Sequence, residues 1–335
     1  MASDDESEVL TELAIGQGNE FVQDLLRAAG AKIGTTKAAF RQNLRAALDG
    51  GQLSPADIRS WLDSVEGWGD QHCFAVLAPA DVRNDKQWKD SVFVQGRVEQ
   101  AGLGHLWNAE RPLSFPGELE VASIQFDGET MSLTWQRALQ QERRRSDLDR
   151  DEISDEEYIV FKAYSRSRKR LLVRFFWQIG QGIAAVFIPS SRDYSDYEAM
   201  RSRITDQLKP LVDISAWPRM DVVRAIRALD DMATAANGGR LSVRPSETTF
   251  AGTSSTIQMR SNSKSGNYQD DADVRQVRRT VVGTGLVGNH GDFRLTRPGR
   301  SESHLRLLAR DQSLLFWGQM EAQDTLGCIF ELCSI

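Results

Sequence analysis

Clusters of arginine and lysine are the side chains in this 335-residue sequence whose type and spacing best suit a chemical task, the binding of phosphate groups. Guanidinium groups present paired N–H donors that match phosphate oxygens, and turns beside a sheet are suitable places for such contacts. One cluster lies on an expected turn between two strands, and another surrounds a Pro-Gly turn. The candidate nucleic-acid-binding residues in these two clusters are Arg166, Arg168, Lys169, Arg170, Arg294, Arg297 and Arg300, and Arg306 and Arg310 follow along the chain.

The distribution of charge agrees with local contact to a polyanion. The net charge is −6, yet the segment 240–310 holds twelve Lys or Arg against six Asp or Glu. A basic C-terminal segment on an acidic body can bind a polyanion locally, although the whole molecule would not be steered toward nucleic acid from a distance. The alternative, in which the arginines are solvated or paired with the many acidic residues, stays open.

A glycine motif at Gly283–Gly288 has the GxGxxG pattern of dinucleotide sites. Such a site needs a helix that begins inside the motif, with its N-terminus at the pyrophosphate. The following segment, Asn289–Pro298, has the residues of turns and no helical stripe. We therefore expect flexible hairpin turns here and no nucleotide cofactor.

Metal-ligand and nucleophile patterns are absent from the sequence. The four histidines (His72, His105, His290 and His304) are scattered without the spacing of a metal site, and Ser190-Ser191 lacks the GxSxG context of a hydrolase. We expect no metal, no cofactor and no catalytic residue. One enzyme alternative remains, a metal-dependent nuclease that would use Asp127 and Glu129 with Lys162.

The clusters must be positioned by the elements around them, and the central element is a predicted meander of three strands. Residues Tyr158–Tyr164, Leu171–Ile179 and Ile183–Ile188 are rich in apolar and aromatic residues, and the middle segment alternates with period two. The basic run Ser165–Arg170 lies between the first two segments, where we expect a tight turn.

The N-terminal part is expected to be helical. Residues 1–18 are predicted to be a disordered or loosely helical acidic tail, and residues 19–104 a helical module. Its helices are expected at Glu20–Ala29, from Thr35 or Thr36 to Gly50, from Ser54 onward and around Asp85–Gln100, because capping residues precede apolar stripes of helical spacing. On the second of these helices, Lys37, Arg41 and Arg45 form one basic ridge.

The remainder, residues 118–335, is predicted to be a mixed, mainly antiparallel sheet with packed helices, so that the fold class is α+β. Asp127-Gly128 joins two alternating segments as a hairpin, residues 137–157 form a charged connection, and helices are expected around Tyr197–Leu208 and Val222–Ala233. Further strands are expected at Thr256–Arg260, Val274–Val282, Asp292–Thr296, His304–Leu308 and Leu326–Leu332.

Cellular location and oligomeric state follow from weaker signals. The acidic N-terminus and the absence of a long apolar run predict an intracellular protein, and the three cysteines are expected to be buried free thiols. The alternating apolar C-terminus, expected to be a strand, makes an exposed sheet edge and therefore a protein partner or a homo-oligomer plausible.

This order of parts resembles the centromere protein N family, in which a pyrin-like helical module precedes an antiparallel sheet domain. The resemblance implies binding to centromeric nucleosomes through the helical module, and pairing with a related protein through the C-terminal part, in the nucleus. It makes Lys37, Arg41 and Arg45 DNA-facing candidates. It makes Leu326, Cys328, Phe330 and Leu332 candidates for a partner interface.

The function that the sequence favours is a non-enzymatic intracellular adaptor that binds DNA or RNA through basic turns and also binds a protein partner. The alternatives are a subunit of a multi-protein microbial defence assembly and a metal-dependent enzyme that processes nucleic acid. Charge reversal at Arg166, Arg168 and Arg170 is expected to weaken nucleic-acid binding in the first case.

Overall fold

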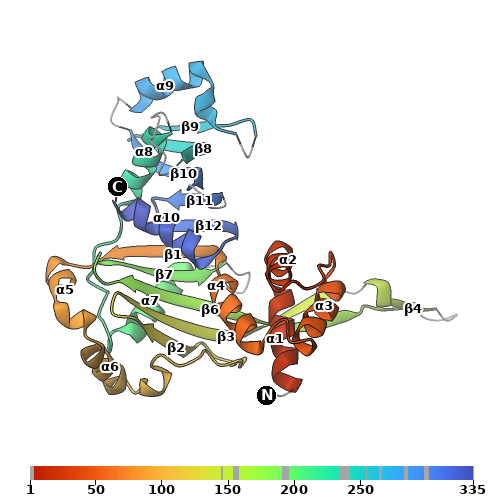
Figure 1. Cartoon of the computed structure of the whole chain (residues 1–335). Coiled ribbons are helices and arrows are strands. Elements are labelled where there is room, and N and C mark those ends of the chain that lie inside the picture. The colour runs from red at the N-terminus through yellow and green to blue at the C-terminus, as the bar shows by residue number, and fades with distance from the viewer. Residues whose placement is uncertain are drawn as a thin grey trace. The chain divides into compact units, whose positions relative to one another are not determined.

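The computed structural model of the chain has the expected α+β class, with an antiparallel ten-stranded sheet and packed helices (Figure 1). The structure describes residues 4–144, 146–153, 158–190, 196–233, 242–253, 255–263, 266–282, 286–297 and 302–334. The order of strands in the large sheet is β2-β3-β6-β7-β1-β12-β11-β10-β8-β9, and β4 and β5 form a separate two-stranded sheet. None of the described helices has the length and apolarity that crossing a bilayer requires.

The bounds of the elements are as follows. The helices are α1 (Asp4–Gly16), α2 (Asn19–Ala28), α3 (Lys37–Asp49), α4 (Pro55–Val65), α5 (Ala80–Asn84), α6 (Ser91–Gln100), α7 (Tyr197–Leu208), α8 (Val222–Met232), α9 (Ala272–Val282) and α10 (Ala322–Ser334), with short 3-10 turns η1 (Lys86–Lys89), η2 (Gly104–Leu106), η3 (Ser146–Leu148) and η4 (Tyr268–Asp270). The strands are β1 (Gly69–Leu77), β2 (Glu120–Phe126), β3 (Thr130–Arg144), β4 (Arg150–Ile153), β5 (Tyr158–Phe161), β6 (Tyr164–Gln178), β7 (Ile183–Pro189), β8 (Ser242–Ala251), β9 (Thr256–Arg260), β10 (Val287–Thr296), β11 (Ser303–Leu308) and β12 (Ser313–Gln319).

The chain divides into two compact units. Each of the strands β2, β3 and β6 has residues in both units. The smaller unit contains Met1–Arg59, Arg111–Ala122 and Trp135–Leu172, and the larger contains Ser60–Glu110, Ser123–Thr134 and Val173–Ile335.

Helices α1, α2 and α3 form the helical part of the smaller unit. Thr36 caps α3 by accepting a hydrogen bond from the Ala39 amide at 3.2 Å, as the sequence predicted. Residues 1–18 were expected to be disordered or loosely helical; disorder is wrong for residues 4–16, and the helical alternative is right, because these residues form α1. Leu10 and Ala14 are fully buried there, and their four-residue spacing places both on one face of a helix that packs on α3.

Strand β6 is longer than expected. It begins at Tyr164, so the predicted basic turn Ser165–Arg170 is wrong: this run lies inside a strand next to β3. Strand β3 in turn continues to Arg144, so the expected charged connection 137–157 begins as strand. Charged residues tolerate a strand when a neighbouring strand satisfies the backbone hydrogen bonds, and the sequence pattern does not show that partner.

The larger unit is built on β1, which was not expected. Residues Gly69–Leu77 pair antiparallel with β7 on one side and with β12 on the other, so the helical module does not extend to residue 104. Cys73 and Ala75 point into the main apolar core, and His72 and Phe74 point to the opposite face. The strand pattern is hidden in the sequence because both faces of this central strand are largely buried.

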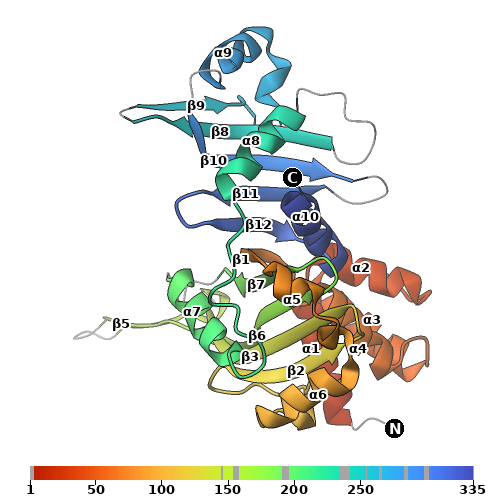
Figure 2. The same ribbon diagram turned by 90° about the vertical axis from the view of Figure 1, so that its left-hand side faces the viewer.

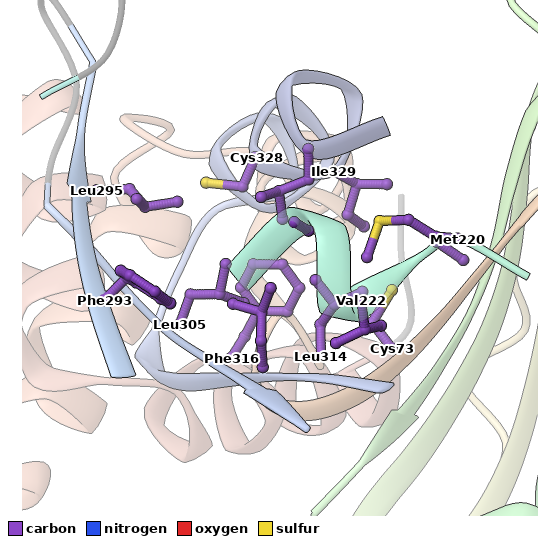
Figure 3. Close-up of a cluster of buried hydrophobic side chains, with 14 of the residues drawn as sticks. Cys73, Met220, Val222, Phe293, Leu295, Leu305, Leu314, Phe316, Cys328 and Ile329 are labelled. Atoms are coloured by element: carbon purple, nitrogen blue, oxygen red, sulfur yellow. The ribbon is translucent and has the colours of Figure 1, made fainter. Parts of the chain in front are cut away.

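Helices α8 and α10 cover one face of strands β8 and β10–β12, and apolar side chains from both sides meet there (Figures 2 and 3). Ile329 and Cys328 of α10 and Val222 of α8 pack over the strand residues Phe293, Leu295, Leu305, Leu314 and Phe316. The expected strand Leu326–Leu332 is therefore wrong. Buried positions 325, 328, 329 and 332 have helical spacing, which competes with the alternation at 326, 328, 330 and 332.

The other expected strand that is a helix is Val274–Val282, which lies in α9. A buried polar cluster joins α9 and η4 to α8: Asp230 accepts hydrogen bonds from Tyr268, Gln269 and Arg278. The Asp230 side chain is fully buried, and Arg278 beside it supplies the compensating charge. Burial and the neighbouring carboxylate raise the pKa of Tyr268, so its hydroxyl stays protonated and donates.

Of the glycines in the glycine motif, the structure describes only the last, Gly288, and the turns expected after it are wrong for residues 289–296, which lie in strand β10. Gly283, Thr284 and Gly285 lie outside the described residues, and strand β10 begins at Val287, where a nucleotide site would need a helix. A Cβ atom on Gly288 would lie 2.6 Å from Cγ2 of Ile226, so glycine lets α8 approach β10 closely. The predicted hairpin at Asp127-Gly128 is confirmed, with Gly128 at φ +89° and Asp127 accepting from the Thr130 amide at 2.6 Å.

Candidate nucleic-acid interface

The three residues of the basic ridge on α3 form ion pairs and hydrogen bonds with α1 and the residue that follows it. Arg41 forms a two-point ion pair with Glu12 at 2.7 and 2.8 Å, and Arg45 pairs with Glu8. Lys37 donates to the carbonyls of Ile15 and Gln17, the second at 2.6 Å. These cations therefore close the end of α1 and neutralise its acidic side, a role that the sequence did not indicate.

The pKa of the Lys37 ammonium reflects this position. Burial lowers it first, and the positive charge of Lys169 lowers it further. Lys169 is an exposed residue of β6, and Arg170 next to it donates to the Pro112 carbonyl at 3.1 Å. Arg166 and Arg168 lie in the same strand, but their side chains lie outside the described part of the structure. The β6 cluster is thus a strand segment and not a turn.

The arginines of the C-terminal basic cluster do not lie together on one turn. Arg297 donates to the backbone carbonyl of Asp324 at 2.7 Å and to its carboxylate at 3.0 Å, which joins the end of β10 to α10. Arg294 instead lies on the sheet, and Arg300 lies outside the described residues.

The residues expected at a partner interface are part of the core. Cys328 and Leu332 are buried, and Leu326 and Phe330 pack against the main apolar cluster. The ring centroids of Phe330 and Phe176 are 6.0 Å apart. These four residues therefore hold α10 on the sheet and form no exposed edge.

The face of strands β8 and β10–β12 that points away from α8 and α10 carries polar and aromatic side chains. Among the described residues of the larger unit, Figure 1 shows no helix on that side of these strands. We call this surface the open face. Its side chains are Arg244, Glu247, His290, Asp292, Arg294, His304, Arg306 and Trp317, which alternate along the strands with the core residues.

Trp317 is the exposed aromatic residue of the open face. Its side chain is 39 % exposed, whereas the neighbouring Phe316 is fully buried, because successive residues of β12 point to opposite faces. The guanidinium carbon of Arg306 lies 4.6 Å from the centre of the ring, and the ring centroid of His304 lies 5.4 Å away. Arg306 thus makes a cation–π contact with Trp317.

Arg306 is held in place by a carboxylate. It donates to the two oxygens of Asp292 at 2.6 and 2.8 Å, from the residue directly opposite on β10. Burial raises the pKa of Asp292, but the hydrogen bonds and charges of Arg306 and His290 outweigh it and hold this pKa well below its ordinary value. Asp292 is therefore an anion at all physiological pH values, and it fixes the guanidinium over the indole.

A row of side chains also crosses four strands of the open face. Arg244 on β8, Arg294 on β10, His304 on β11 and Trp317 on β12 are opposite one another in register. Burial and the charge of Arg294 lower the pKa of His304; Asp292 acts in the other direction, and Arg306 lowers this pKa a little further. The imidazole is therefore mainly neutral near pH 7 and adds an aromatic surface beside Trp317.

Sequence reasoning found Arg294 but missed this arrangement. It treated His304 as scattered and assigned no role to Arg244 or Trp317, because neither β8, which holds Arg244, nor β12, which holds Trp317, was predicted as a strand. The detectable signal was the alternation in His304–Leu308 and in Ser313–Gln319, which places Trp317 on the face opposite Phe316.

The residues of the nuclease alternative have structural contacts. Asp127 accepts hydrogen bonds from the backbone amides of its own turn, and Glu129 pairs with Lys89 at 2.7 Å. Within the described ranges, no group of three or more His, Cys, Asp or Glu could hold a metal ion.

No model of a protein family matches the chain, and no curated protein matches it. A function must therefore be inferred from the side chains of the open face.

Proposed function

We propose that this protein is a non-enzymatic adaptor that binds nucleic acid through the open face and a protein through a separate apolar surface. The observation that carries the first part is Trp317, an exposed indole on a sheet face, with an arginine fixed over its ring. Aromatic side chains on open sheets stack with the bases of single-stranded RNA or DNA, and arginines contribute charge beside them.

The charges of the open face point to a particular mode of binding. Arg244, Arg294 and Arg306 are matched in number by Glu247, Asp292 and Glu302, so these six side chains carry no net charge. Bulk attraction to duplex phosphates is then modest, and stacking supplies the larger share of the binding free energy. This balance favours single strands over duplexes, since bases in a duplex are stacked on one another and do not reach the indole.

The test is the substitution Trp317→Ala, measured by fluorescence anisotropy with labelled single-stranded DNA and RNA at about 50 and 200 mM salt. Loss of one stacked base costs about 1–3 kcal/mol, so affinity is expected to fall roughly 5- to 150-fold. Trp317→Phe is the matched control, because it keeps an aromatic ring and should lose less. Wild-type affinity in Trp317→Ala would remove the open face as the binding site.

A protein partner is supported by the two-stranded sheet β4–β5. Three successive residues of β5 have exposed apolar side chains: Ile159 at 42 %, Val160 at 44 % and Phe161 at 48 %. Leu148 and Tyr164 nearby in the chain are also exposed, and we call these five residues the apolar arm. A two-stranded sheet buries little apolar surface by itself and leaves strand edges that another strand can join.

The simplest partner is a second copy of this chain, since two such sheets can pair edge to edge. Light scattering over a range of protein concentrations measures this self-association. Phe161→Asp is expected to reduce the apparent mass to that of the monomer, while Val92→Asp, at an exposed apolar position on α6, should not. A wild type that is monomeric throughout would refute self-association. An adaptor of this kind would act inside the cell.

A further inference from the structure

Two arginines on neighbouring strands of the open face hold a single carboxylate. Arg244 and Arg294 are directly opposite each other on β8 and β10. Glu302 accepts a hydrogen bond from Arg294 Nη1 at 2.8 Å, and its other oxygen pairs with Arg244. The Glu302 side chain is 28 % exposed, so this anion is partly withdrawn from water.

Two converging guanidinium groups are an arrangement that suits a phosphate as well as a carboxylate, because both anions present several oxygens to paired N–H donors. The Glu302 carboxylate occupies the position at which a phosphate would bind. It comes from the residue just before β11 and is therefore a ligand supplied by the chain itself.

The site continues toward the aromatic end of the same row. Adjacent strands are about 4.8 Å apart, so Arg244, Arg294, His304 and Trp317 span roughly 14 Å across four strands. One end of the row offers aromatic rings to bases, and the other offers two cations to the backbone. That separation of chemistry matches a single strand lying across the sheet with a few nucleotides in contact.

We propose that Arg244 and Arg294 form a backbone-phosphate site for single-stranded nucleic acid, and that Glu302 fills this site until a phosphate displaces it. The inference rests on the proposed function of the open face and adds an internal competitor to it. Displacing Glu302 weakens the wild-type affinity, because two ion pairs must be broken before the phosphate can enter.

The experiment compares wild type, Glu302→Gln and Glu247→Gln in binding to a single-stranded oligonucleotide and to a duplex of the same sequence. Glu247→Gln is the matched control, since it removes one negative charge from the same face, where Glu247 pairs with Arg260 at 3.4 Å. Glu302→Gln is expected to tighten single-strand binding several-fold more than the control does. In a plot of the logarithm of the binding constant against the logarithm of the salt concentration, the slope should also become steeper by about 0.7. This is the value for one additional phosphate contact with a single strand.

A second arm uses inorganic phosphate alone and follows the thermal unfolding of each variant. Stabilisation by phosphate that is greater in Glu302→Gln than in wild type, and absent when Arg294→Ala is added, supports the anion site independently of any nucleic acid. If phosphate stabilises Glu302→Gln but its oligonucleotide affinity does not rise, the site takes free phosphate, and the assignment to nucleic acid is wrong.

The remaining outcomes separate this inference from the proposed function. If Trp317→Ala weakens binding as expected but Glu302→Gln and Glu247→Gln behave alike, the phosphate site is refuted and the open face remains the binding surface. If neither wild type nor Glu302→Gln binds any oligonucleotide, the proposed function fails, and this inference fails with it.

Discussion

The basic ridge of α3 and the open face of the sheet contain the same kinds of side chain and differ in what their partners leave accessible. On the ridge, Arg41 and Arg45 pair with acidic residues of another helix, and Lys37 binds its terminal carbonyls. On the open face, Arg306 also pairs with a carboxylate, but this pair lies within the sheet surface and supports an exposed indole.

This difference shows that arginine content alone is a poor guide to a binding surface. The ridge cations pair with the acidic side of α1, whose Leu10 and Ala14 are buried in the helix that packs on α3. The open-face pair of Arg306 and Asp292 holds the guanidinium over one part of the Trp317 ring, and Trp317 remains 39 % exposed. An ion pair on a candidate surface can therefore mean one of two things. Either the charges are used within the protein to join two elements, or they hold side chains in position for a ligand. An exposed aromatic residue beside the pair indicates the second case.

The largest effect on stability is expected when the ion pair of the open face is broken, and a much smaller one when a pair of the ridge is broken. Asp292 is only 10 % exposed, so Asp292→Asn leaves Arg306 without its anion in a half-buried position and should cost about 1–3 kcal/mol. Glu12 is 46 % exposed, so Glu12→Gln on the ridge should cost no more than about 0.5 kcal/mol. Hydrogen exchange of β10 and β11 amides, compared with α1 and α3 amides, measures both. Equal costs at the two sites would remove the distinction.

The same aspartate gives a pH dependence with a definite sign. The pKa of Asp292 is lowered in the folded protein, so its contribution is complete above the ordinary carboxyl value of 3.8 and is lost as the pH falls below it. The stability difference between wild type and Asp292→Asn should be constant from about pH 5 to pH 7 and should shrink below about pH 4. Unfolding by denaturant over this range tests the prediction, and a difference that grows toward low pH would contradict it.

The smallest expected effect on nucleic-acid binding concerns the ridge. The double substitution Arg41→Glu and Arg45→Glu should lower stability by about 1 kcal/mol, since two exposed pairs are replaced by like charges. It should leave single-strand affinity nearly unchanged, because these cations take no part in the open face.

The matched control restores the ion pairs with opposite polarity, through Glu8→Arg and Glu12→Arg in the same protein. Stability is expected to recover in this fourfold variant. A large loss of DNA binding on reversal of the ridge would instead support the role that the resemblance to the centromere protein N family implies, and would shift the binding surface from the sheet to the helices.

Local patterns were sufficient for those elements whose signals lie within a few residues. Capping residues and apolar stripes predicted α2, α3 and α4, and Asp127-Gly128 predicted the hairpin between β2 and β3, because helix ends and tight turns depend on neighbours in the chain. The α+β class followed from the same signals.

Long-range partners determined the rest. Gly69–Leu77 became a central strand because β7 and β12 satisfy its backbone on both sides, and Leu326–Leu332 became helical because a sheet face was available to bury one of its two competing patterns. The basic run of β6 became strand for a similar reason.

The order of amino acids was enough to predict the fold class and the basic character of residues 240–310, and it contains Arg294, Arg306 and Trp317. Their meeting on one surface depended on the pairing of β8, β10, β11 and β12, which brings residues from Arg244 to Trp317 into register. The pairing of Arg294 with Glu302 and of Arg306 with Asp292 depended on it too. Side-chain alternation can be recognised along one strand, but the register between strands is set by contacts between distant residues, and one sequence does not display these.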